Sequence, residues 1–223
     1  LPSWVPNHDI YDRGKKCIGV LDGTSHFIEL FKVEKSLNND YEDYLDITSR
    51  DYYFLIHAAA GDIGILSHRQ YLNQNENRYD IKTELGQLAY NSFAIAGNYG
   101  FANRLYIYHV LKELIDQYVP NLEHIEIFSD ASHDYLDYDK DNNIFLHRKG
   151  ATKLLPGNLF SDYKSWSITG KPYIFPSCVG GDAYIISNNI GNPNSYFTVS
   201  HGAGRLIRKD IAIDLYKNKK IDN

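Results

Sequence analysis

The segment over residues 82–119 is the sequence feature that most limits the possible folds. Apolar residues recur there at helical spacing, and Pro120 ends the pattern because proline cannot continue a helix. Gly86, Gly97 and Gly100 lie inside the segment. Because glycine is unfavourable within a helix, we predict two helices with a break near the middle. The periodic apolar positions are Leu105, Tyr108, Leu111, Leu114 and Ile115.

Runs of aromatic and β-branched residues, which are typical of strands, lie on both sides of this helical segment. Residues 15–33 predict two strands around the Asp22-Gly23 turn, and residues 52–57 predict a buried strand followed by a helix to Gln70. Strand, helix and strand in this order predict an α+β fold with a mixed β-sheet core and a helical insert over about 61–119, in a single domain over 1–223. The later predicted strands are 124–128, 143–147, 172–175, 183–187 and 196–199.

Composition narrows the class of protein further. The chain is 43% hydrophobic and 14% aromatic, as expected for a globular protein, and its formal net charge is -5. A nucleic-acid partner would therefore need a local basic patch. We see no apolar run that could span a membrane, no signal peptide, and only two cysteines. We therefore expect a cytoplasmic protein without a membrane partner.

Three of the nine histidines follow or end predicted strands, where a rigid sheet can aim side chains into one site. His26, His57 and His133 come from different segments, and imidazole is a good ligand for several transition metals. Taken singly, each of them is better explained as a core histidine with one hydrogen-bond partner. Their spacing matches no compact zinc signature. The residues alone therefore leave a metal site and a structural role open.

Two segments that combine cations with glycine favour phosphate chemistry. One is His147-Arg148-Lys149-Gly150-Ala151-Thr152, and the other is Ser200-His201-Gly202-Ala203-Gly204-Arg205. Glycine lets the backbone approach a ligand, arginine pairs with phosphate oxygens, and histidine can act as a nucleophile on a phosphoryl group. A solvated basic turn is the alternative for the first segment, and a strand ending in a glycine turn is the alternative for the second.

These two segments together resemble the RtcB-type RNA ligases. Four further segments resemble the family's Gly-Asn-His-Phe-hydrophobic-Glu, Asn-Tyr-Ala-Phe-Ala-Asn-Arg, Asp-x-x-His-Asn and Pro-Gly-Ser-Met-Gly-x-x-Ser-Tyr elements in the same order. They lie at residues 22–30, 98–104, 129–134 and 176–184. The resemblance extends from about Cys17 to Lys209.

The resemblance implies an enzyme that joins an RNA 3′-phosphate or 2′,3′-cyclic phosphate to a 5′-hydroxyl, with GTP and one or two Mn²⁺ ions. It implies that His201 becomes guanylylated, that His26, His57 and His133 bind metal, and that an archease-like helper protein is a possible partner. The nucleotide-binding positions carried over are Ser25, Phe27, Glu29, Pro176, Ser177, Cys178, Gly202, Ala203 and Gly204. Those carried over for phosphate or RNA are Arg104, His147, Arg148, Lys149 and Arg205.

Some family elements have no counterpart in these 223 residues. The family's Asp-x-Gly-Cys-Gly-Met motif, which supplies a cysteine and an aspartate to the metals, is not matched by Lys16-Cys17-Ile18-Gly19. We therefore expect at most one well-held metal, and leave open whether the motif lies upstream of Leu1. The family's C-terminal segment, whose lysine contacts the guanine, is also unmatched. The alternatives are a non-catalytic relative that binds RNA ends or nucleotide, and a metal-dependent phosphohydrolase.

Overall fold

A computed structural model describes residues 8–21, 25–72, 79–122, 124–176, 181–202 and 207–218. The chain divides into two compact units. Unit 1 comprises Leu1–Val33 and Arg50–Arg148, and unit 2 comprises Glu34–Ser49 and Lys149–Asn223. Both helices and strands are present, which confirms the α+β class. That the two units form a single domain stays a prediction.

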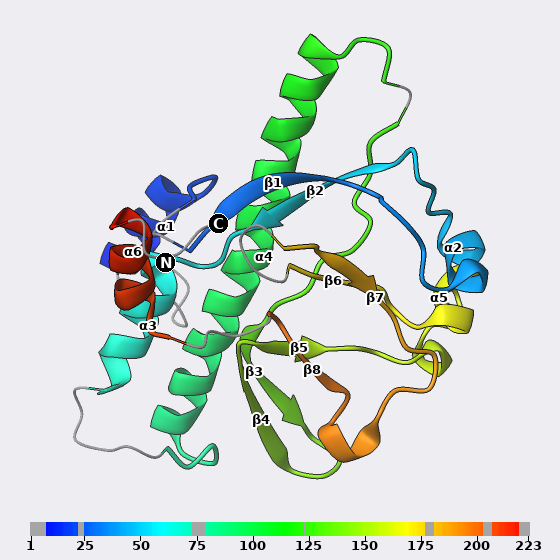
Figure 1. Cartoon of the computed structure of the whole chain (residues 1–223). Helices are drawn as coiled ribbons and strands as arrows, with labels where there is room; N and C mark the ends of the chain where they lie inside the picture. The colour runs from blue at the N-terminus through cyan, green and yellow to red at the C-terminus, as the bar shows by residue number, and fades with distance from the viewer. Residues whose placement is uncertain are drawn as a thin grey trace. The chain divides into compact units, whose positions relative to one another are not determined.

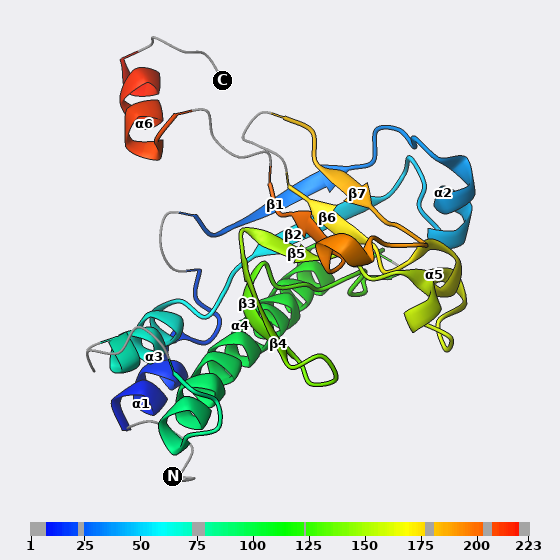
Figure 2. The ribbon, with the colours of Figure 1, turned by 90° about the horizontal axis from the view of Figure 1, so that it is seen from below.

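Three helices form most of unit 1: α1 (His8–Cys17), α3 (Asp62–Leu72) and α4 (Glu84–Tyr118). Figure 2 shows α1 and α3 beside the first half of α4, and both pairings, of α1 with α3 and of α3 with α4, bury side chains. The buried face of α4 consists mainly of small residues, which lets its neighbours approach closely. Its buried residues are Gly86, Ala89, Ser92, Ala96, Gly100, Asn103 and Ile107.

The long helix α4 corrects our expectation of two helices with a break at the glycines. Thr83 caps its N-terminus, where Oγ1 accepts a hydrogen bond from the Gly86 amide at 3.0 Å, and the helix stops before Pro120. Gly86 and Gly100 face other parts of the chain. A Cβ on Gly86 would lie 1.9 Å from the Asp80 carbonyl oxygen, and one on Gly100 would lie 3.5 Å from the Ala60 amide nitrogen. Tertiary packing therefore outweighs the intrinsic cost of glycine in this helix.

Unit 1 also contains two strand pairs. Strand β1 (Phe27–Lys32) pairs antiparallel with β2 (Tyr52–His57), with Phe27 opposite His57 and Lys32 opposite Tyr52. Strand β3 (Asp134–Asp139) pairs with β4 (Ile144–Lys149) across a turn over 140–143. The Asp139 carboxylate stabilises this turn by accepting from the amides of Asp141 and Asn142, each at 3.1 Å.

Two strand predictions in unit 1 are wrong. Residues 15–17 belong to α1, so only one strand, β1, lies in the predicted 15–33 pair, and residues 22–24 lie outside the described part. Residues 124–128 form neither a strand nor a helix. Aromatic and β-branched residues favour strands only where a partner strand is available, and local composition does not report that partner.

Unit 2 consists of short elements. Strand β5 (Ala151–Lys153) pairs antiparallel with β8 (Thr198–Ser200), and β6 (Tyr173–Phe175) pairs antiparallel with β7 (Tyr184–Ile186). Thr152, Thr169 and Pro172 are among its most buried residues. Its helices are α2 (Asn39–Leu45), α5 (Lys164–Thr169) and α6 (Lys209–Lys217), with 3₁₀ turns η1 (Gly157–Leu159) and η2 (Pro193–Ser195).

The described strands form four separate two-stranded sheets, which corrects the expected mixed β-sheet core. The helical insert lies where we expected it, since α3 and α4 both fall within 61–119. Strand β8 starts later than predicted because Tyr196 and Phe197 have left-handed φ values of 50° and 55°, which a strand cannot contain. Within the described ranges, no helix is long and apolar enough to cross a membrane.

Candidate metal centre

His57, the last residue of β2, is held by two contacts from the neighbouring strand and its preceding turn. Its ring stacks on Phe27, with the ring centroids 4.8 Å apart and the planes 24° apart. Its Nδ1 lies 2.8 Å from the Ser25 carbonyl oxygen. A carbonyl can only accept, so Nδ1 carries the hydrogen in this contact and the lone pair of the neutral ring is on Nε2.

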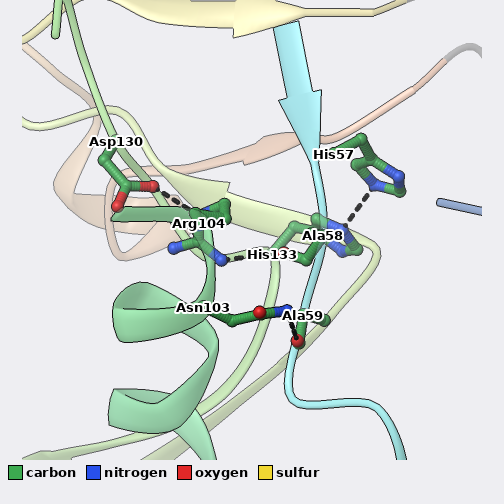
Figure 3. Close-up of polar contacts among 7 residues, drawn as sticks. All are labelled: His57, Ala58, Ala59, Asn103, Arg104, Asp130 and His133. Atoms are coloured by element: carbon green, nitrogen blue, oxygen red, sulfur yellow. Dashed lines mark hydrogen bonds and ion pairs between the residues drawn. The ribbon is translucent and has the colours of Figure 1, made fainter. Parts of the chain in front are cut away.

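His133 presents its own Nε2 to that lone pair. The two Nε2 atoms are 3.0 Å apart, and the rings are parallel within 6° (Figure 3). The other nitrogen of His133, Nδ1, is buried and lies 3.3 Å from a carboxylate oxygen of Asp134, a contact that does not have hydrogen-bond geometry. With the hydrogen of His57 on Nδ1, its Nε2 accepts a hydrogen bond from Nε2–H of His133 when no metal is bound. A metal that replaces this hydrogen bond needs the lone pairs of both Nε2 atoms, and therefore the Nδ1–H form of both rings.

His26 completes a cluster of three imidazoles in unit 1. Its ring centroid is 5.6 Å from that of His57, with the planes 64° apart. The structure thus places the ring of His26 beside His57 and that of His57 beside His133, while their binding of a metal stays a prediction. The distance between the two Nε2 atoms suits a metal, because nitrogens about 2.1 Å from one ion and about 90° apart lie about 3.0 Å from each other.

The electrostatic surroundings keep His57 neutral. Burial lowers the pKa of His57 below 6.5, and the nearby His133, His26 and Arg104 lower it further. The hydrogen bond to the Ser25 carbonyl opposes this shift without cancelling it. Since a metal ligand must be unprotonated, a lowered pKa keeps this imidazole available for binding at neutral pH.

Two consecutive residues of α4 hold the chain just after His57 (Figure 3). Arg104 donates from Nη1 to the Ala58 carbonyl at 3.0 Å and from Nε to Asp130 at 2.7 Å. Asn103 donates to the Ala59 carbonyl at 3.1 Å. These contacts fix the end of β2 to α4, and they tie the segment before His133 to the same helix. Asn103 and Asp130 were not among our predicted site residues, although both lie in segments that resemble the family.

The predicted phosphate ligands on α4 and β4 lie in different surroundings. The Arg104 side chain is 13% exposed, and among the described residues its Nη2 is buried without a hydrogen-bond partner. On β4, Arg148 is buried, with Nη1 3.3 Å from Asp137, whereas His147 and Lys149 are exposed. The roles of all four in binding phosphate or RNA stay predictions.

The predicted nucleophile His201 follows β8 in unit 2. Its amide donates to the Gly150 carbonyl at 3.0 Å, and its Nδ1 lies 2.5 Å from the hydroxyl of Tyr173. Tyr173 is 8% exposed, and burial raises its pKa, so the phenol keeps its proton. No sequence pattern pointed to Tyr173. Because His201 belongs to unit 2, its distance from the imidazoles of unit 1 stays a prediction.

The remaining predicted nucleotide ligands are distributed over both units. Ser25 and Phe27 contact His57 as described, and Glu29 is exposed on β1. Pro176 directly follows β6, and the Gly202 carbonyl accepts from the Ser200 hydroxyl at 2.7 Å. Their binding of nucleotide stays a prediction. Ser177, Cys178, Ala203, Gly204 and Arg205 lie outside the described residues.

The fold and the imidazole cluster define an α+β protein with a candidate metal centre at the end of a strand pair. Comparison with known families identifies its family: the family described as tRNA-splicing ligase RtcB matches residues 2–223. This chain therefore belongs to the RtcB family, as its motifs predicted.

Individual relatives agree at low identity. The tRNA-splicing ligase RtcB of Methanocaldococcus jannaschii is 26% identical over 94% of this chain and 24% of its own length. That of Thermococcus kodakarensis is 24% identical over 95% of this chain and 49% of its own length. The RNA-splicing ligase RtcB of Mycobacterium tuberculosis is 24% identical over 88% of this chain and 50% of its own length. The chain thus spans between a quarter and a half of the length of these relatives.

Proposed function

We propose that this chain is the catalytic core of an RNA ligase that joins RNA 3′-phosphate or 2′,3′-cyclic phosphate ends to 5′-hydroxyl ends. The proposal is carried by one observation: His57 and His133 direct their Nε2 atoms at each other across 3.0 Å, in a chain that belongs to the RtcB family. The names of its relatives, which describe RNA-splicing and tRNA-splicing ligases, support the same reaction class.

In this proposal His26, His57 and His133 hold Mn²⁺. The ion would neutralise charge on phosphate oxygens during transfer. The chain's own contribution is the orientation of the ligands: the Ser25 carbonyl fixes the His57 ring, and the carboxylate of Asp134 lies 3.3 Å from Nδ1 of His133. Such outer contacts set the tautomer and raise the basicity of a metal-binding imidazole. Asp130 is engaged by Arg104, which leaves imidazoles as the main donors of the described cluster.

His201 is the proposed nucleophile, which accepts GMP from GTP and passes it to the RNA 3′-phosphate before the 5′-hydroxyl displaces it. A neutral imidazole is competent for such an attack on a phosphorus atom. The archease-like helper and the cytoplasmic location, which the resemblance and the composition suggest, belong to the same proposal.

Substitution of His57 tests the metal centre. We expect His57→Ala to weaken Mn²⁺ binding by at least about 10-fold, because one ligand and its oriented lone pair are lost. Titration of the protein followed by the EPR signal of free Mn²⁺ measures this affinity. His124→Ala is the matched control, because that imidazole is 73% exposed and lies 3.2 Å from the Glu126 carboxylate, away from the three histidines. Equal Mn²⁺ affinity in His57→Ala and wild type would contradict the metal centre.

Labelling with GTP tests the nucleophile. Protein incubated with Mn²⁺ and GTP radiolabelled on the α-phosphate is expected to become covalently labelled, and His201→Ala is expected to remain unlabelled. Labelling that persists in His201→Ala would eliminate this residue as the acceptor. Binding of GTP without transfer in the wild type would instead favour a non-catalytic relative that binds nucleotide or RNA ends.

A further inference from the structure

Arg104 on α4 contacts both segments that carry the facing imidazoles of unit 1. Its Nη1 donates to the carbonyl of Ala58, the residue directly after His57, at 3.0 Å. Its Nε donates at 2.7 Å to Asp130, which precedes His133 in the same segment. His57 and His133 are 76 residues apart in the chain, yet one guanidinium contacts the segments of both (Figure 3). A shift of either segment therefore disturbs a contact of Arg104.

The surroundings of Arg104 hold its guanidinium inside unit 1. The side chain is 13% exposed, and its Nη2 is buried. The guanidinium carbon lies 4.6 Å from the ring centroid of Phe101, one turn earlier on the helix, in a cation–π contact. Its Nε and Nη1 already donate within the unit. A phosphate group would therefore find little of this guanidinium at the surface.

We propose that Arg104 is a positioning residue, which fixes the contact between His57 and His133 and is not itself a phosphate ligand. The inference deepens the proposed function, in which these imidazoles hold a metal ion, and rests on it for the role of that ion. The Nε2 atoms of the two rings are 3.0 Å apart, so a displacement of either segment by about 1 Å breaks their contact. Arg104 opposes such a displacement because it binds both segments to the same helix.

The shape of the arginine side chain suits this role. Its Nε and Nη1 donors have fixed directions in one plane, and each meets a different acceptor, the Asp130 carboxylate and the Ala58 carbonyl. Hydrogen bonds from a charged donor to a carboxylate are also among the stronger ones in proteins. A lysine ammonium is a point charge on a flexible stem, so it serves a phosphate group but does not reproduce two directed contacts. Arg104→Lys therefore separates positioning from phosphate binding.

The contact between the two imidazoles can be measured in the full chain without metal. In protein with ¹⁵N-labelled histidine, NMR detects a coupling between the two Nε2 nuclei across their hydrogen bond. We expect this coupling in the wild type and its loss in Arg104→Lys, because the two segments are no longer held together. Arg13→Lys is the matched control, since the Arg13 side chain is 54% exposed and pairs with Asp62 between α1 and α3. A coupling that persists in Arg104→Lys, or is absent from the wild type, would overturn the inference.

Metal binding gives a second readout. In an EPR titration, we expect Arg104→Lys to bind Mn²⁺ at least about 10-fold more weakly than the wild type, the usual effect of losing an outer contact of a metal site. Arg13→Lys is expected to match the wild type. Circular dichroism of the same samples shows whether Arg104→Lys is folded. If it is not, the double variant Arg104→Met/Asp130→Ala replaces it in both measurements, because removing both partners of an ion pair leaves no charge unpaired.

RNA binding tests whether Arg104 is also a phosphate ligand. The double variant keeps the net charge of the chain, so it probes the position rather than the overall charge. Without Mn²⁺, its slope of log affinity against log salt for a single-stranded RNA with a 3′-phosphate is expected to equal that of the wild type. A slope reduced by about 0.7, the value for one phosphate contact, would identify Arg104 as a phosphate ligand and overturn this part of the inference.

The outcomes distinguish this inference from the proposed function. If the wild type binds no Mn²⁺ but Arg104→Lys loses the coupling between the imidazoles, the metal centre fails and the positioning role is supported. If Arg104→Lys keeps both the coupling and the Mn²⁺ affinity of the wild type, the positioning role is overturned and the metal centre stands.

Discussion

Asn103 illustrates how one side chain can hold three separate stretches of unit 1 together. Its Oδ1 accepts from the Gly19 amide at 2.6 Å, and its Nδ2 donates to the carbonyls of Val20 and Ala59 at 3.2 and 3.1 Å. The residue is 2% exposed, so water does not replace these bonds. Since Ala59 lies two residues beyond His57, the amide also helps to place the imidazole cluster. At the residue scale, the candidate site depends on a buried polar residue that is not a ligand.

Replacement of Asn103 tests this role. We expect Asn103→Ala to lower the free energy of unfolding by about 3 kcal/mol, because it leaves a buried N–H and two carbonyls without their partner. Urea denaturation followed by circular dichroism measures the change. Asn98→Ala on the exposed side of the same helix is the control, and alanine's helix propensity makes it neutral or slightly stabilising. Similar stabilities for the two variants would show that the buried hydrogen bonds contribute little.

At the scale of elements, the glycines of α4 have opposite roles despite lying in one helix. Gly86 is buried against the turn before the helix, where a Cβ would lie 1.9 Å from the Asp80 carbonyl oxygen. At Gly97 a Cβ would meet nothing within 4 Å. The first glycine is required by packing, whereas the second costs helix stability without a steric reason. This difference explains why a pattern of glycines alone wrongly predicted a break.

We therefore expect substitution by alanine to have opposite effects on the free energy of unfolding at these two glycines. Gly97→Ala is expected to raise the free energy of unfolding by about 0.5–1 kcal/mol through better helix propensity. Gly86→Ala is expected to lower it by more than about 1 kcal/mol, because the methyl group displaces backbone. Thermal unfolding of both variants beside the wild type measures the changes. Destabilisation by Gly97→Ala, or tolerance of Gly86→Ala, would contradict this account of the helix.

At the scale of the whole molecule, a net charge of -5 makes general attraction to RNA weak. The RNA binding proposed above must then depend on a few local cations. Within His147-Arg148-Lys149, alternation along β4 exposes His147 and Lys149, while Arg148 is buried beside Asp137. The exposed members are the ones whose side chains lie at the surface, where a phosphate group can reach them.

Salt dependence tests this expectation. Lys149→Ala is expected to weaken binding of a single-stranded RNA with a 3′-phosphate and to reduce the slope of log affinity against log salt by about 0.7, the value for one phosphate contact. Filter binding at several salt concentrations gives the slope. Lys112→Ala, which removes the same charge from an ion pair with Asp116 on α4, is the control. An equal reduction by both substitutions would mean that overall charge, not this position, governs binding.

Local sequence patterns were sufficient to predict many of the helices and strands of this protein and several of its candidate site residues. Helical periodicity predicted the position of α4, and Pro120 its end. Aromatic and β-branched runs predicted the positions of β2, β4, β6 and β7. Short motifs identified the family and the three histidines whose rings the structure places beside one another. These features depend on neighbours in the chain, so they can be read without knowing what packs against them. The predicted break in α4, the strand at 124–128 and the mixed sheet failed because each depended on partners distant in sequence.

The sequence by itself determined the class of fold, the family and the candidate ligands, because residue type and spacing carry that information. Only the tertiary structure decided that the Nε2 atoms of His57 and His133 lie 3.0 Å apart and that Asn103 and Arg104 hold the chain that follows His57. It also decided that the Tyr173 hydroxyl contacts Nδ1 of His201. The reason is physical: ring orientation, tautomer and burial are set by atoms up to 76 residues away in the chain, and no local pattern contains them.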